Sequence, residues 1–138
     1  MAVGTITLTS RELVDIGKSE RNYIEVVTVD WAASSTDASI PTLAVDLRGW
    51  LVKAITNPGT TAPTANYDIS LTDPEDSGLD AAATLLNNRH TSTTEQVYPL
   101  ISGAASPILL AGTYTISIAN NSVNSATGRI IFYLAEDF

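Results

Sequence analysis

The alternation of hydrophobic and polar side chains is clearest in residues 49–73, where two candidate β-strands flank a loop rich in Pro, Gly and Thr. In the second strand Tyr67, Ile69 and Leu71 fall on one face, and the residues between them are polar. This period of two is typical of a strand with one face on a core and the other in water. Because the loop prolines cannot donate to a β-ladder, we expect the chain to turn there and form a hairpin.

The same alternation recurs at intervals of about ten residues along the chain, with turn-forming residues between the strands. The further candidate strands are residues 3–9, 13–16, 22–32, 43–55, 95–101, 107–110, 113–119 and 129–134. This spacing predicts an all-β fold: one antiparallel β-sandwich of the jelly-roll type with about eight strands. Residues 80–88 are the one candidate helix, of barely two turns, and we expect residues 1–138 to form a single domain.

Gly49 interrupts the strand that begins at residue 43. Beyond it, the apolar series either continues in phase through Leu51 or shifts by one residue. A β-bulge at Gly49 would produce the shift and would keep Lys53 out of the core. We prefer the bulge.

Two strands carry apolar side chains on both faces, residues 22–32 and residues 129–134. A strand of this kind is covered on both sides, and a single sandwich core covers only one. We therefore expect a second subunit to cover the other face, and predict a homo-oligomer, a trimer. The apolar residues opposite the expected core series are Ile24, Val26, Ile131 and Tyr133.

The charge of the chain is strongly negative, with fifteen acidic and seven basic residues and a net charge of −8. Such a surface repels nucleic acid and anionic lipid, so we expect neither as a partner. The absence of cysteine excludes disulfides, thiolate metal sites and thiol nucleophiles. The N-terminal residues lack the pattern of a signal peptide, and no apolar run reaches the length of a membrane span, which predicts synthesis in the cytoplasm.

Residues with catalytic or ligand-binding chemistry are few. His90, the one histidine, lies in a polar stretch without a nucleophile elbow, so we expect an exposed or locally hydrogen-bonded ring rather than a catalytic base. The acidic turn at residues 73–80 is either a solvated turn, which we prefer because it lacks EF-hand spacing, or a calcium site. Trp31 and Trp50 are either core residues, which we prefer, or an aromatic platform of a carbohydrate-binding module. We therefore expect no enzymatic activity and no cofactor.

Several segments are similar to a group of small β-rich proteins of tailed-bacteriophage virions. The segments are residues 63–73 (PTANYDISLTD), 86–89 (LNNR) and 94–100 (TEQVYPL), with agreement at 4–9 (GTITLT), 112–120 (GTYTISIAN) and 128–134 (GRIIFYL). The resemblance covers most of the chain after residue 49, and its motifs are structural rather than catalytic.

The resemblance implies a structural part of a virion, and we expect a decoration (cement) protein on the capsid exterior. Its partner would be the major capsid protein; a neck or tail part, connector or fibre-associated, is the alternative. Residues 1–9 are either an extended arm that adds a strand to the capsid or simply the first strand of the sandwich. The apolar residues of this segment that we expect to contact a partner are Val3, Ile6 and Leu8.

Overall fold

The computed structural model describes residues 3–15, 23–72, 86–101 and 104–135, and these residues form ten β-strands and no helix. The strands are β1 (Thr5–Asp15), β2 (Tyr23–Ala32), β3 (Leu43–Pro58), β4 (Tyr67–Thr72), β5 (Leu86–Arg89), β6 (Glu95–Val97), β7 (Leu100–Ile101), β8 (Ala104–Ala105), β9 (Ile108–Ala119) and β10 (Thr127–Ala135). In this part of the chain, accordingly, there is no helix that could span a membrane.

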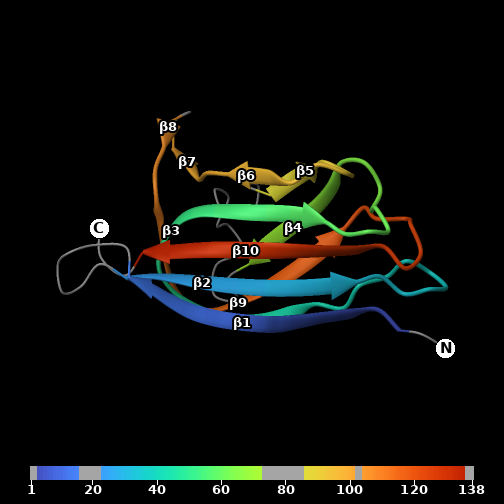
Figure 1. The fold of residues 1–138 in the computed structure, drawn as a ribbon, viewed down its shortest axis with the longest axis horizontal. Helices are drawn as coiled ribbons and strands as arrows, with labels where there is room; N and C mark the ends of the chain where they lie inside the picture. The colour runs from blue at the N-terminus through green and yellow to red at the C-terminus, as the bar shows by residue number, and fades with distance from the viewer. Residues whose placement is uncertain (1–2, 16–22, 73–85, 102–103, 136–138) are drawn as a thin grey trace.

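Eight strands form one antiparallel sheet in the order β1-β2-β10-β3-β9-β4-β5, with β6 beside β3, and β7 and β8 form a separate pair. The sheet folds over on itself, because β3 pairs with β10 through its C-terminal half and with β9 through its N-terminal half. In Figure 1, β1, β2, β10 and the end of β3 lie in front of β9 and β4. We call these the front and back layers. The expected all-β sandwich is confirmed in this form, whereas the jelly-roll connectivity stays a prediction.

The fold-over takes place where β3 passes from the back layer to the front layer, near Gly49. Gly49 has φ of 127°, and a Cβ there would lie 2.9 Å from the carbonyl oxygen of Ala135, so only glycine fits. The predicted position of the bulge was wrong, because Leu51 is buried in phase with Leu47 and the register with β10 shifts only after Leu51. Lys53 does lie outside the core, as expected.

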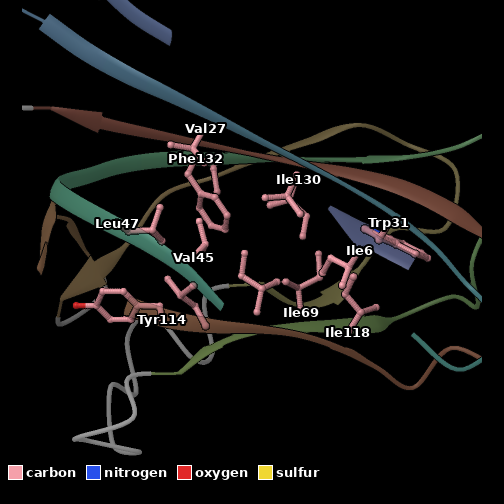
Figure 2. Packing of buried hydrophobic residues seen from close by; sticks show 14 of the residues in the cluster. Ile6, Val27, Trp31, Val45, Leu47, Ile69, Tyr114, Ile118, Ile130 and Phe132 are labelled. Atoms are coloured by element: carbon pink, nitrogen blue, oxygen red, sulfur yellow. The ribbon is translucent and has the colours of Figure 1, made fainter. Parts of the chain in front are cut away.

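The core fills the space between the two layers (Figure 2). Phe132 of β10 projects from the front layer toward Val45 and Leu47 of β3 in the back layer, and Ile130 of β10 projects toward Ile69 of β4; all five are buried. The alternation predicted for β4 is confirmed, since its three apolar residues are buried and its polar residues are partly exposed. The layers also meet through two aromatic rings, Trp31 and Tyr67, whose centroids lie 5.7 Å apart.

At each open side of the sandwich an arginine side chain links the two layers. On one side Arg11 of β1 donates to the carbonyl oxygen of Asp46 in the back-layer half of β3. On the other side Arg89 of β5 lies 3.6 Å from Glu95 of β6. These side chains connect strands that do not pair through their backbones, so side-chain contacts hold the two layers together at both open sides.

Two local predictions were wrong, one about which strands are neighbours and one about a helix. β3 and β4 do not form a hairpin, because β4 pairs with β9 and β5, and β9 lies between β3 and β4. Residues 86–88, expected to end a helix, belong to strand β5. The rest of that helix and the acidic turn at residues 73–80 lie outside the described residues.

Candidate binding surfaces

The outward faces of the two layers differ in chemistry. On the back layer the outward positions of β4 and β9 are mostly Ser, Thr and Asp, as expected for a face in water. On the front layer, half-buried apolar residues of β2, β10 and β3 stand at outward positions. We call these residues the outer patch: Ile24, Val26, Ile55, Ile131 and Tyr133. One face of the molecule is thus suited to binding, and the opposite face to solvent.

The register explains why these residues lie together. Tyr133 is directly opposite Val26 of β2 on one side and Lys53 of β3 on the other, and Ile131 is directly opposite Ile55. Directly opposed residues in an antiparallel pair share a face and contact each other. The Lys53 side chain lies over the Tyr133 ring, with Nζ 4.6 Å from the ring centroid. The same ammonium group lies 3.4 Å from Oε1 of Gln96. The patch is therefore a packed surface with a cation at its edge.

Charged residues of opposite sign stand on opposite halves of this face. Glu12 of β1 and Asp30 of β2 occupy one half, and Arg129 of β10 and Lys53 of β3 occupy the other. Arg129 binds Asp30 through two contacts, Nε to Oδ1 at 2.7 Å and Nη2 to Oδ2 at 3.2 Å. Thr9 donates to the same carboxylate at 2.6 Å. The hydrogen bond from Arg129 lowers the pKa of Asp30, against the opposing effect of desolvation.

The second candidate surface is the free edge of β1. Among the described residues β1 pairs only with β2, so the backbone groups along its other side have no strand partner. Three apolar side chains of this strand are exposed: Leu8 by 41%, Leu13 by 67% and Val14 by 40%. Arg11 is the charged residue that reaches from this edge across to β3. A long edge strand with exposed leucines is the usual acceptor of an added strand.

Six of the seven residues expected to bind a partner divide into two groups. Ile24, Val26, Ile131 and Tyr133 do lie together, in the outer patch. Residues 5–9 are the beginning of β1, paired with β2, which is the second of the two alternatives for this segment. Leu8 is exposed on the β1 edge, and Val3 is exposed just before it.

Ile6 belongs to neither surface. It is a core residue opposite Trp31 in the β1–β2 register, and only 8% of its surface is exposed. Its assignment as a partner contact was wrong, because the alternation of β1 turns Ile6 inward. Ile55 was not among the expected contacts, although the predicted shift in phase already placed it outside the core with Lys53; its position beside Ile131 appears only in the pairing of β3 with β10.

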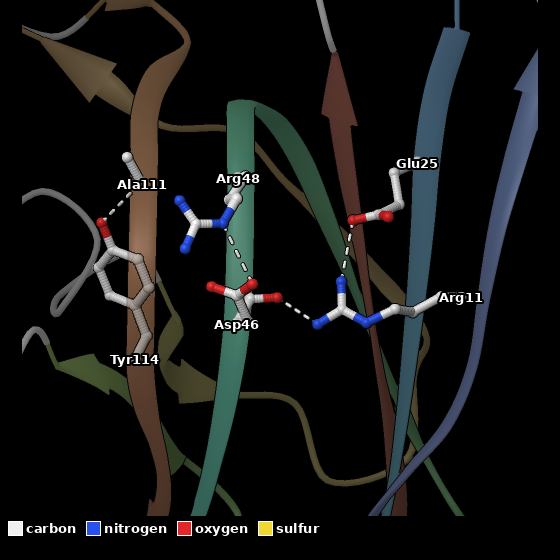
Figure 3. A network of polar contacts seen from close by, with 6 residues as sticks. All are labelled: Arg11, Glu25, Asp46, Arg48, Ala111 and Tyr114. Atoms are coloured by element: carbon white, nitrogen blue, oxygen red, sulfur yellow. Dashed lines mark hydrogen bonds and ion pairs between the residues drawn. The ribbon is translucent and has the colours of Figure 1, made fainter.

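A cleft of about 550 Å³ opens between the layers beside the β1 edge, and Figure 3 shows the polar residues around it. Arg11 approaches Glu25 at 3.0 Å and also donates to the carbonyl oxygen of Asp46. Arg48 lies 3.1 Å from the carboxylate of Asp46. Both arginines of this cleft are thus already bound to acidic residues or carbonyl oxygen, which is the arrangement of a structural link rather than of an anion-binding site.

His90 is exposed, as expected, and its ring organises the loop that contains it. Nδ1 accepts from the backbone N–H groups of Ser92 and Thr93 at 3.1 and 3.0 Å, while the backbone N–H of His90 donates to Oε1 of Glu95 at 2.7 Å. Nδ1 is thus an acceptor, with the ring proton on Nε2. Within the described residues no group of three or more acidic or histidine side chains could hold a metal ion.

The two tryptophans have different environments. Trp31 is 2% exposed and belongs to the core, as we preferred from the sequence. Trp50 is half-buried near the bend of β3, directly opposite Leu109 of β9 and Ala135 of β10. An aromatic platform for sugars requires exposed ring faces, so the two side chains do not form one together.

No protein-family model matches the chain, and no curated protein matches it.

Proposed function

We propose that the protein is a non-enzymatic structural component of a tailed-bacteriophage virion, a decoration or cement protein on the outer surface of the head. The observation that carries this proposal is the free β1 edge, a strand of eleven residues with exposed Leu8, Leu13 and Val14. The capsid contact would form by strand addition: main-chain hydrogen bonds supply affinity, and the leucines select the partner. The partner is the major capsid protein.

The charge and the polar back layer support an exterior position. A net charge of −8 is repelled by packaged DNA and tolerated on the outside of a shell. With the β1 edge bound to the capsid, the Ser- and Thr-rich face of β4 and β9 remains available for solvent. Such a protein stabilises the shell by mass action, because it binds the assembled lattice and not the separated subunits.

The number of copies per particle tests the proposal. We expect quantitative mass spectrometry of purified virions, normalised to the major capsid protein, to find a copy number in proportion to the capsid lattice. A count of a few copies would instead place the protein in the neck or tail, the alternative location. Complete absence from virions would overturn the proposal.

The proposed contact has its own test with shells stripped of this protein. Leu8→Asp places a charge on the β1 edge and is expected to abolish rebinding. Tyr98→Asp is the control, because Tyr98 is also an exposed hydrophobic residue but directly follows β6, which pairs with β3 and not with β1. Equal rebinding by the two variants would show that the capsid contact lies elsewhere.

A carbohydrate-binding module remains the second candidate, although the burial of Trp31 removes one of its two aromatic residues. Glycan-array binding that is lost on Trp50→Ala, with the fold retained, would favour it over a structural role. The proposal also includes self-association, for which the sequence predicts a trimer.

A further inference from the structure

No described strand covers the apolar outer patch, and the charged residues around it indicate what does. Across the front layer the order of strands is β1, β2, β10 and β3. Within the described strands, the register places two acidic residues, Glu12 and Asp30, outward on β1 and β2, and two basic residues, Lys53 and Arg129, outward on β3 and β10. The face is therefore divided into an acidic half and a basic half, with the outer-patch residues of β2 and β10 at the boundary.

We infer that the outer patch binds a second copy of this chain, face to face, about a twofold axis that runs along the strands between β2 and β10. This inference specifies how the self-association in the proposed function takes place, and it rests on no other part of that function. The axis exchanges the two halves of the face, so β2 of one copy lies over β10 of its partner. Each acidic residue then faces a basic one, Glu12 over Lys53 and Asp30 over Arg129, while the apolar side chains of β2 pack on those of β10.

The other way of stacking two such faces is disfavoured by the same charges. A twofold axis that lies in the plane of the face but perpendicular to the strands would place β1 over β1 of the partner and β3 over β3. The acidic half would then face the acidic half and the basic half would face the basic half, and like charges across an interface cost several kcal/mol. Both axes keep the strands of the two sheets nearly aligned and about 10 Å apart, as face-to-face sheets prefer, so the charges decide between them.

The size of the patch sets the expected strength of the contact. Four strands spaced by about 4.8 Å, with outward residues about 6.8 Å apart along each, give a face of roughly 20 Å by 20 Å. This is smaller than the roughly 800 Å² per partner of a standard stable interface, so we expect a reversible dimer at micromolar concentration. An isologous contact of this kind makes a dimer rather than the trimer predicted from the sequence.

Sedimentation equilibrium at roughly micromolar to 100 µM concentration tests the inference. The wild-type chain is expected to reach twice the 14.6 kDa mass of one chain. Lys53→Glu and Glu12→Lys should each weaken association about tenfold or more, because each creates two like-charge contacts per dimer. Arg48→Glu is the matched control: it makes the same charge change as Lys53→Glu but lies on the back layer, and should leave association unchanged.

Mixing the two weakened variants, Lys53→Glu and Glu12→Lys, is the decisive measurement. In a mixed pair the two substituted positions face each other with opposite charges, and the unchanged Lys53 of one chain faces the unchanged Glu12 of the other. We expect the equimolar mixture to associate as strongly as the wild type and to contain mostly mixed dimers by native mass spectrometry. A monomeric or trimeric wild type, or a mixture no stronger than its components, would overturn the inference. None of these measurements uses virions, so their outcome does not test the proposed location on the capsid.

Discussion

The indole of Trp31 covers Gly128 so closely that a Cβ on the glycine would lie 2.5 Å from both Cε2 and Cζ2 of the ring. The two residues are directly opposite each other in the β2–β10 register, on the core side of the front layer. The absence of a side chain at Gly128 is what allows the largest residue of the core to lie flat against the neighbouring strand. The contact holds Trp31 in place beside Tyr67.

Gly128→Ala should therefore lower the free energy of unfolding by about 1 to 3 kcal/mol, because an additional methyl group in a packed core forces the indole or a strand to move. Urea denaturation measures the change. In a Trp31→Leu background the same substitution should cost clearly less, since the clashing ring is gone. An equal cost in both backgrounds would show that the glycine is required for another reason.

The buried phenol of Tyr67 predicts a loss of stability at alkaline pH. Burial raises the pKa of Tyr67 to about 12 from 10.0, because the charged phenolate would lose its hydration. The folded protein then holds this proton more tightly than the unfolded chain, so the contribution is complete below pH 10 and is lost as the pH rises toward 12.

Absorbance of tyrosinate should accordingly show at least one of the five tyrosines titrating late, and Tyr67→Phe should remove that late step. The urea midpoint of the wild type should also fall more steeply above pH 10 than that of Tyr67→Phe. Titration of all five tyrosines near pH 10 in the folded protein would contradict the prediction.

The ion pair of Asp30 and Arg129 predicts the opposite pH dependence. The hydrogen bond from Arg129 lowers the pKa of the Asp30 carboxyl below 3.8, so the stabilisation is present above that pH and lost as the pH falls below it. Because the pair is partly exposed, Asp30→Asn should cost no more than about 1 kcal/mol at neutral pH. The difference between wild type and variant should narrow in acid, which urea denaturation at about pH 7 and about pH 3 can measure; a constant difference would argue against linkage.

The link from Arg11 to the backbone of Asp46 predicts a local change in dynamics. Arg11→Lys keeps the charge but loses the planar fork that reaches both Glu25 and β3, so the end of β1 should open more often. Amide hydrogen exchange along β1 should accelerate several-fold, with a cost of about 1 kcal/mol. Arg48→Gln is the control, because Arg48 is paired with Asp46 of its own strand, and it should leave β1 unchanged.

Patterns confined to one strand were predictable from the sequence. The alternation of β4, and that of Tyr114, Ile116 and Ile118 in β9, correctly separates buried from outward side chains. This works because successive side chains of an extended chain point to opposite sides, whatever the strand's neighbours are. The same local rule identified the four apolar residues of β2 and β10 that lie opposite the core series and form most of the outer patch.

Only the tertiary structure decided which strands are neighbours. β9 lies between β3 and β4 although it follows both in the sequence, which replaces the expected hairpin. The shift after Leu51, which directs Ile55 outward, arises from the register of β3 against β10. The outer face likewise combines strands from the beginning, the middle and the end of the chain, with β10 between β2 and β3. Strand pairing depends on packing between residues far apart in sequence, so no periodicity within a strand contains it.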